Sequence, residues 1–158
     1  MGPEDTMIDT TLCHLHKDGK WLMMLRCKKP DDLNEGKWIA PGGKSEPGET
    51  PEQCARRETK EETGLIPGEM KCLGVVHFRS DRWEDEEMHV FECGDFTGEL
   101  LKDCPEGRLE WIEEERMMDL PMWEGDRLFL PDVLAKKPGI DLTLIYEGDR
   151  LVRWRKGS

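Results

Sequence analysis

The stretch that decides the fold reads Gly43-Lys-Ser-Glu-Pro-Gly-Glu49, followed by Arg57-Glu58-Thr59-Lys60-Glu61-Glu62-Thr63-Gly64-Leu65. Its acids Glu58, Glu61 and Glu62 stand at positions i, i+3 and i+4. On a helix such side chains lie roughly 5–6 Å apart, where like charges repel. Acids near a helix C-terminus also oppose the backbone dipole. A divalent cation bound between the carboxylates would explain why they are clustered.

Residues 51–63 are predicted to form this helix. Thr50 suits the N-cap, Pro51 suits the first helical position, and Gln53 completes a capping box with Thr50. Gly64 suits the left-handed residue that commonly follows a helix. The acids therefore belong to the last two turns of a short, well-capped helix.

The small and apolar residues of this segment indicate which face is buried. At 100° per residue, Cys54, Ala55 and Leu65 share an arc with the three acids, whereas Arg56 and Lys60 point away from it. The arc is expected to face inward and the two basic residues to face solvent. Because unpaired buried charge is costly, this placement favours a metal site over a solvated charged helix.

Length and charge restrict the class of protein. A chain of 158 residues suits one domain with its own core. A net charge of −12 argues against a nucleic-acid or anionic-membrane surface but allows a small polyanionic substrate neutralised by metal ions. The longest apolar run, at 21–25, is too short to span a membrane. Residues 1–9 are polar, and the six cysteines are scattered along the chain. We therefore expect a cytoplasmic protein whose thiols are reduced.

Apolar and alternating stretches predict the remaining elements. Strands are expected at 10–16, 21–26, 38–40, 70–78, 87–93, 108–112, 141–146 and 150–154. A helical turn is expected at 113–118, and a second helix at 126–136, where Pro131 obscures the start. Asp18-Gly19 and Glu147-Gly148-Asp149 suit hairpin turns. This order indicates an α/β sandwich in which helices cover a mostly antiparallel or mixed sheet.

The acidic helix and the loop before it also resemble a known motif. Gly43, Glu49, Arg57-Glu58, Glu61-Glu62, Gly64 and Leu65 match the Nudix box, G-x5-E-x7-R-E-U-x-E-E-x-G-U, at every spacing. The chain resembles the Nudix hydrolases, most closely the MutT-type group of 8-oxo-dGTP diphosphatases and oxidised-purine nucleoside triphosphatases. Thr59 departs from the motif, which has a bulky aliphatic there; the residue falls at the flank of the inward face and bears on packing rather than chemistry.

The resemblance implies a fold and a reaction. The fold is the Nudix fold, an α/β/α sandwich with a central mixed sheet, expected as a single domain over residues 1–158 with the box at 43–65. The reaction is metal-dependent hydrolysis of a nucleoside triphosphate, possibly of an oxidised purine such as 8-oxo-dGTP, to a monophosphate and pyrophosphate. The metal is Mg²⁺, for which Mn²⁺ can substitute. The resemblance assigns its ligands to the Gly42 carbonyl, Glu58, Glu61, Glu62 and Glu106.

Further roles follow from the same resemblance. Glu61 and Glu58 are the candidate general bases, and Glu106 is equally well explained as an ordinary loop acid. Glu49 and Arg57 are expected to tie the glycine loop to the helix, a structural role shared with Gly43 and Gly64. The basic residues Arg26, Lys28 and Lys44 are candidates for phosphate contacts or for solvated surface.

Base recognition is less well defined by the sequence. Asp126 matches a position at which oxidised-purine hydrolases place a base-reading carboxylate, and Trp123 is a candidate wall of the pocket. The competing hypotheses make Asp126 a helix N-cap and Trp123 a core residue. Ile39 departs from the asparagine that base-reading members often carry, so it cannot make a bidentate base contact.

Markers of other branches are missing from the sequence: the proline of ADP-ribose hydrolases, the tyrosine of diadenosine-polyphosphate hydrolases and the motif of NADH hydrolases. Nucleoside triphosphates remain the leading substrates. The alternatives are hydrolysis of another nucleoside diphosphate derivative and a non-catalytic nucleotide-binding module. The expected partner is a small nucleotide, not a nucleic acid or a membrane, and the chain is expected to be a monomer or a homodimer.

Overall fold

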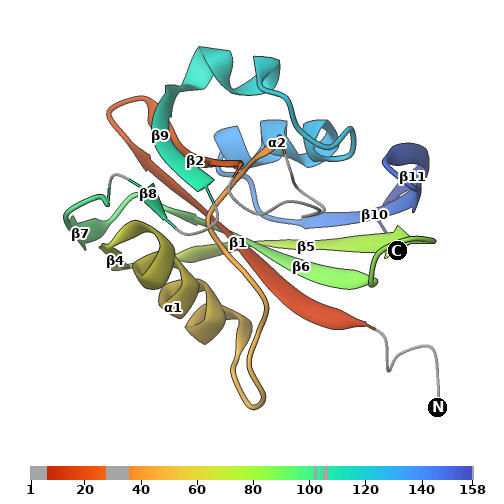
Figure 1. Cartoon of the computed structure of the whole chain (residues 1–158), viewed down its shortest axis with the longest axis horizontal. Helices are drawn as coiled ribbons and strands as arrows, with labels where there is room; N and C mark the ends of the chain where they lie inside the picture. Colours follow the sequence, from red (N-terminus) through yellow and green to blue (C-terminus); the bar gives the residue numbers. More distant parts are fainter. Residues whose placement is uncertain (1–6, 28–35, 102, 105–106, 158) are drawn as a thin grey trace.

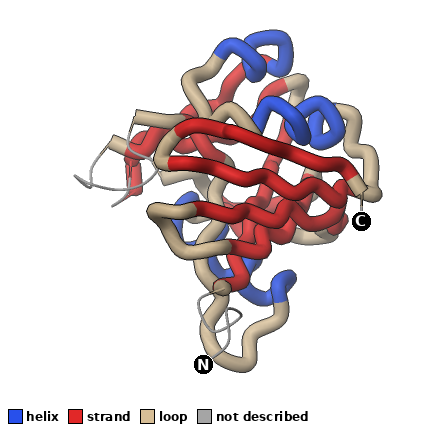
Figure 2. Tube along the Cα trace, turned by 90° about the vertical axis from the view of Figure 1, so that its right-hand side faces the viewer, coloured by secondary structure: helices blue, strands red, loops and turns tan. Residues whose placement is uncertain are grey.

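Two helices lie on opposite sides of a curled sheet in the computed structural model, which describes residues 7–27, 36–101, 103–104 and 107–157. Helix α1 (Pro51–Thr63) lies on one side, and α2 (Asp126–Leu134) lies on the other with the short 3-10 helix η2 (Glu114–Asp119) (Figure 1). Figure 2 shows neighbouring strands side by side with helices above and below them. This layering confirms the expected α/β/α sandwich.

The sheet mixes parallel and antiparallel neighbours, as predicted. Its order is β11-β10-β5-β6-β1-β2-β9-β8, with β3 paired to β2, and a separate two-stranded sheet joins β4 to β7. The β1–β6 and β5–β10 pairs are parallel, and the others are antiparallel. The strands are β1 (Ile8–Lys17), β2 (Lys20–Arg26), β3 (Trp38–Ile39), β4 (Leu65–Pro67), β5 (Lys71–Ser80), β6 (Glu86–Cys93), β7 (Phe96–Gly98), β8 (Asp103–Cys104), β9 (Gly107–Glu113), β10 (Ile140–Glu147) and β11 (Arg150–Lys156).

The glycine-rich loop is fixed along one edge of β1. On this edge β1 pairs with β2 only at His16 and Lys17, which leaves its first half open. The loop fills the gap: the Cys13 N–H donates to the Pro41 carbonyl at 2.7 Å and the Thr11 N–H donates to the Gly43 carbonyl at 2.9 Å. A Cβ at position 42 would lie 1.9 Å from the Thr11 carbonyl oxygen, so only glycine fits there.

Apolar residues fill both sides of the sheet. The larger cluster joins α2 to the inner faces of β5 and β10, through residues such as Phe129, Val76 and Leu144. The smaller cluster includes Leu65, which directly follows α1, and Leu15 of β1. Helix α2 is thus part of the larger cluster, whereas α1 buries Cys54 and Ala55 and adjoins the smaller cluster through Leu65.

Three details differ from the sequence prediction. Leu65 begins strand β4 rather than extending the apolar arc of α1. The short strands β4, β7 and β8 were not predicted, because they are only two or three residues long. Helix α2 ends at Leu134 rather than at 136, since Lys136 has a left-handed φ of 55° that no α-helix continues. Within the described ranges, no helix is long and apolar enough to cross a membrane.

Candidate active site

The predicted caps of α1 are present and fix the position of its acids. The Thr50 hydroxyl accepts from the Gln53 N–H at 3.1 Å, and the Gln53 side-chain oxygen accepts from the Thr50 N–H at 2.9 Å. Gly64 ends the helix with φ 80°, and its N–H bonds to the Lys60 carbonyl at 3.0 Å. The helix therefore covers residues 51–63, as expected.

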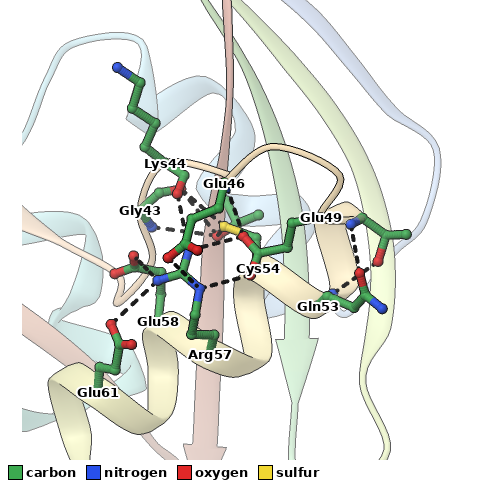
Figure 3. Close-up of polar contacts among 11 residues, drawn as sticks. Gly43, Lys44, Glu46, Glu49, Gln53, Cys54, Arg57, Glu58 and Glu61 are labelled. Carbon is green, nitrogen blue, oxygen red and sulfur yellow. Dashed lines mark hydrogen bonds and ion pairs between the residues drawn. The ribbon is translucent and has the colours of Figure 1, made fainter.

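Arg57 is the centre of the ion pairs on this helix. Its guanidinium donates to both oxygens of Glu49, at 2.7 and 2.9 Å, and to the Lys44 carbonyl at 3.2 Å (Figure 3). It also donates to Glu58 at 2.7 Å and to Glu61 at 3.3 Å. The hydrogen bonds from Arg57 hold the pKa of Glu49 down to about 2. The glycine loop is thus tied to the helix by the pair predicted for that purpose.

Two of the three acids lie against the glycine loop. The Glu62 side chain is 6% exposed, and its Oε1 accepts from the Gly42 N–H at 2.8 Å. The Glu58 side chain is 19% exposed, and its carboxyl carbon lies 2.6 Å from where a Cβ at position 43 would be. Gly43 therefore leaves the space that the Glu58 carboxylate occupies.

The third acid, Glu61, is not on the buried face, contrary to the sequence prediction. Its side chain is 60% exposed and contacts Arg57. The buried residues of α1 are Cys54, Ala55, Thr59, Glu62 and Thr63. At 100° per residue their arc is centred about 90° from Cys54, which leaves Glu61 at its outer edge. Thr59, expected at the flank, is fully buried, and Arg56, expected in solvent, donates to the Pro67 carbonyl at 2.9 Å.

The carboxylates supply the right atoms for a hard cation, although their side chains do not converge. In the ranges that the structure describes, no three acidic, histidine or cysteine side chains are placed to share a metal ion. Arg57 draws Glu58 and Glu61 toward itself, and the Gly42 N–H holds Glu62. An oxygen-only donor set from one helix and one loop nevertheless suits Mg²⁺ or Mn²⁺. Glu106 lies outside the described residues.

A cavity of about 300 Å³ opens beside the glycine loop, on the α2 side of the sheet. Its wall is largely apolar, built from β1, β2, β3, β5, β6, β10 and α2, and Ile39 contributes an apolar patch to it. The polar and charged side chains that line it belong to Thr10, Thr11, His14, Arg26, Lys44, Glu86, Asp126 and Tyr146, together with the indole of Trp123. Gly42 and Gly43 lie in the same wall. The loop therefore borders the cavity on one side and the α1 acids on the other.

The structure excludes one of the two hypotheses for Asp126, the N-cap role. Gly125 is the N-cap of α2 and no side chain caps this helix, so Asp126 is not the cap. It is the first helical residue, and it lines the cavity. Burial, with a further contribution from the charge of Glu86, raises the pKa of the Asp126 carboxyl to about 7. Trp123 is 5% exposed, as expected for a core residue, and it also lines the cavity.

The basic candidates differ in their surroundings. Arg26 lines the cavity and is half-buried at the end of β2. Lys44 also borders the cavity, is exposed, and lies 4.0 Å from Glu84. Lys28 lies outside the described residues. Two of the three basic side chains are thus positioned beside the glycine loop.

The segment that contains α1, the glycine loop and most of the cavity wall matches a known protein family. The model of the NUDIX domain matches residues 9–133. The chain belongs to the Nudix family. The match covers α1, nearly all of α2 and the strands from β1 to β9 except Ile8, whereas Leu144 and Tyr146 of the cavity wall lie beyond it.

Similar proteins place the chain near the MutT-like members of the Nudix family. It is 34% identical over 134 residues to the uncharacterized Nudix hydrolase YvcI of Bacillus subtilis, over 82% of this chain and 80% of that protein. It is 36% identical over 110 residues to the oxidized purine nucleoside triphosphate hydrolase of Danio rerio, over 69% and 70%. The crystal structure of a MutT protein from Bacillus halodurans matches with a TM-score of 0.83 at 30% identity, covering 94% and 97%. The chain is a MutT-like Nudix hydrolase, a class that generally uses a divalent metal.

Several residues of this Nudix cavity escaped the sequence prediction. Glu86 lines it from β6, and His14 lines it from β1, where burial lowers the pKa of the imidazole to about 4 and keeps it neutral. The Tyr146 hydroxyl accepts from the Gly125 N–H at 2.7 Å and so fixes the start of α2 next to Asp126. Alternation along β6 and β1 could have placed Glu86 and His14 on one face. The contact of Tyr146 has no sequence signal.

Proposed function

We propose that this Nudix hydrolase cleaves nucleoside triphosphates between the α and β phosphates, releasing a nucleoside monophosphate and pyrophosphate. Oxidised purine nucleotides such as 8-oxo-dGTP are within the proposed substrate class. The observation that carries the proposal is the position of Gly42 and Gly43, which border the cavity and also contact the α1 acids. A base in the cavity would place its phosphates across this loop, beside the carboxylates. The name of the Danio rerio protein, an oxidized purine nucleoside triphosphate hydrolase, supports the same substrate class.

The residues that would hold the metal are Glu58, Glu61 and Glu62 with the Gly42 carbonyl. Their donor atoms are all oxygens, as Mg²⁺ prefers, and Glu61 is exposed enough to turn toward its neighbours. A bound Mg²⁺ withdraws charge from phosphate oxygens and makes a bound water more acidic. Mn²⁺ prefers similar ligands and is expected to substitute.

The residues of the chain itself would position substrate and accept a proton. Glu61 and Glu58 are the candidate bases for the attacking water, and Glu61 has the freer carboxylate because Arg57 approaches Glu58 more closely, at 2.7 against 3.3 Å. Arg26 and Lys44 would offset phosphate charge at the cavity edge. The net charge of −12 favours a free nucleotide over a nucleic acid as substrate. We infer that one domain performs all of these steps.

The test is pyrophosphate release from a panel of nucleoside triphosphates in Mg²⁺. We expect Glu61→Gln and Glu62→Gln each to lower turnover by about two orders of magnitude or more while the fold is kept, because a glutamine amide oxygen at position 62 can still accept from the Gly42 N–H. The matched control is Glu52→Gln, an exposed acid in the first turn of the same helix. If both site variants keep near-normal rates, the proposed site is wrong.

The alternative of a non-catalytic binding module makes a different prediction. Such a protein binds nucleotides but releases neither pyrophosphate nor phosphate at a rate that depends on the helix acids. A second panel of nucleoside diphosphate derivatives distinguishes the other hydrolase alternative, since only the preferred class should reach saturation at low substrate concentration.

A further inference from the structure

Glu86 places a second carboxyl in the cavity that we assign to the base. It lies on β6, lines the cavity and is half-buried. The Thr10 hydroxyl donates to its Oε1 at 3.0 Å. A carboxylate has two oxygens with about four acceptor positions, so this hydrogen bond leaves most of its capacity available.

The two carboxyls approach the cavity from different elements. Asp126 comes from the first turn of α2, and Glu86 comes from the first residue of β6. Burial raises the pKa of Glu86 as well as that of Asp126, and the charge of Glu86 contributes to the rise at Asp126. Both groups line the same cavity, and both lose hydration there.

The rest of the wall limits which bases can satisfy this pair. Apolar side chains such as Phe78, Met88 and Leu144 line the same cavity as the carboxyls, and Ile39 adds no hydrogen-bonding group. Carboxylate oxygens in a largely apolar cavity favour N–H donors, and a base with a single donor group leaves one of the two carboxyls without a hydrogen bond from the base. A base edge with two neighbouring N–H groups can donate to both.

We propose that Glu86 is a second base-reading residue, which together with Asp126 selects nucleotides whose base edge carries two neighbouring N–H donors, as the guanine edge does. This inference rests on the proposed function, because it assigns the base to the same cavity. It gives β6 a role in specificity in addition to its place in the sheet.

The experiment measures kcat/KM for dGTP, dTTP and dCTP with the wild-type chain and with Glu86→Gln. The glutamine retains an acceptor for Thr10 but presents an amide NH₂ to the donors of guanine. We expect the dGTP to dTTP ratio of kcat/KM to fall by about tenfold or more, mainly through a higher KM for dGTP. The kcat/KM for dTTP should fall little or rise, because thymine has one ring N–H between two carbonyls.

The matched control is Glu110→Gln, which removes the same charge from an exposed residue of β9, outside the cavity wall. We expect this variant to change the ratio by less than about twofold. An unchanged ratio in Glu86→Gln would overturn the proposal, as would a larger loss for dCTP than for dGTP, since cytosine offers only one donor group.

Binding of the products separates failure of this inference from failure of the proposed function. Calorimetry with dGMP and dTMP, without metal, reports base selection independently of hydrolysis. We expect Glu86→Gln to weaken dGMP binding about tenfold and dTMP binding little. If no nucleotide is hydrolysed but this difference is found, the proposed reaction fails and base reading by Glu86 stands. If hydrolysis proceeds but Glu86→Gln changes neither the dGTP to dTTP ratio of kcat/KM nor the dGMP to dTMP ratio of affinities, Glu86 has no role in base selection.

Discussion

At the scale of single residues, the cavity carboxyl of Asp126 makes stability depend on pH. Its folded pKa of about 7 lies above the ordinary value of 3.8, so the unfolded chain loses this proton first as pH rises. The group therefore costs stability progressively from about pH 4 to pH 7. We predict that Asp126→Asn gains roughly 1–3 kcal/mol relative to the wild type between pH 5 and pH 8. Urea unfolding of both proteins at the two pH values measures this, and a constant difference would contradict it.

Thr59, which departs from the Nudix motif, also affects stability as a single residue. Its side chain is fully buried, and its hydroxyl has no hydrogen-bond partner among the described residues. Burial raises the pKa of the nearby Cys13 thiol, a rise that the Thr59 hydroxyl partly offsets. We predict that Thr59→Val, which keeps the shape and removes the polar group, raises the free energy of unfolding by about 1 kcal/mol.

The control for this substitution lies one turn further along the helix. The Thr63 hydroxyl donates to the Thr59 carbonyl at 2.6 Å and accepts from the Leu65 N–H at 3.0 Å. Thr63→Val should therefore destabilise by about 1–2 kcal/mol in the same urea titration. If Thr59→Val and Thr63→Val changed the free energy of unfolding equally, the difference in hydrogen bonding between the two hydroxyls would not matter for stability.

At the scale of elements, the start of α2 depends on a contact from β10. The Tyr146 hydroxyl accepts the Gly125 N–H, and a Cβ on Gly125 would lie 2.5 Å from Leu144. We predict that Tyr146→Phe costs about 1–2 kcal/mol of stability, because a buried N–H loses its partner. Since Asp126 follows Gly125, KM for the preferred nucleotide should rise more than kcat falls. Urea unfolding and steady-state kinetics test both parts, and a larger loss in kcat than in KM would argue against this role.

Elements with local signals were predictable, and those defined by distant partners were not. The capping residues Thr50 and Gln53 with Gly64 determine α1 within the helix itself. The hairpin at Asp18 and Gly19 also follows from its turn, whose two residues have φ of 52° and 75°. The β4–β7 pair joins segments about thirty residues apart, with nothing in either to indicate the other.

The candidate site divides in the same way. The motif predicted the contact between Glu49 and Arg57, which is present. It did not predict the exposure of Glu61, because the apolar residues used to orient the helix included Leu65, which belongs to a strand. Glu86 was not predicted, since the strand was expected to begin at residue 87 and Glu86 is its first residue in the structure.

At the scale of the whole molecule, repulsion among carboxylates is the property that a bound cation would relieve. The chain carries a net charge of −12, and three of its acids stand at positions 58, 61 and 62 of α1. If these acids bind a divalent cation only in the folded state, a tenfold excess over Kd stabilises by about 1.4 kcal/mol, which raises Tm by roughly 3–6 °C. We predict this rise with MgCl₂ or MnCl₂ in the absence of nucleotide, and its loss in a Glu58→Gln, Glu61→Gln double variant. NaCl at matched ionic strength accounts for general screening, which acts on both proteins alike. The proposed cation site would be refuted by a rise of the same size in the double variant, or by NaCl reproducing the whole effect.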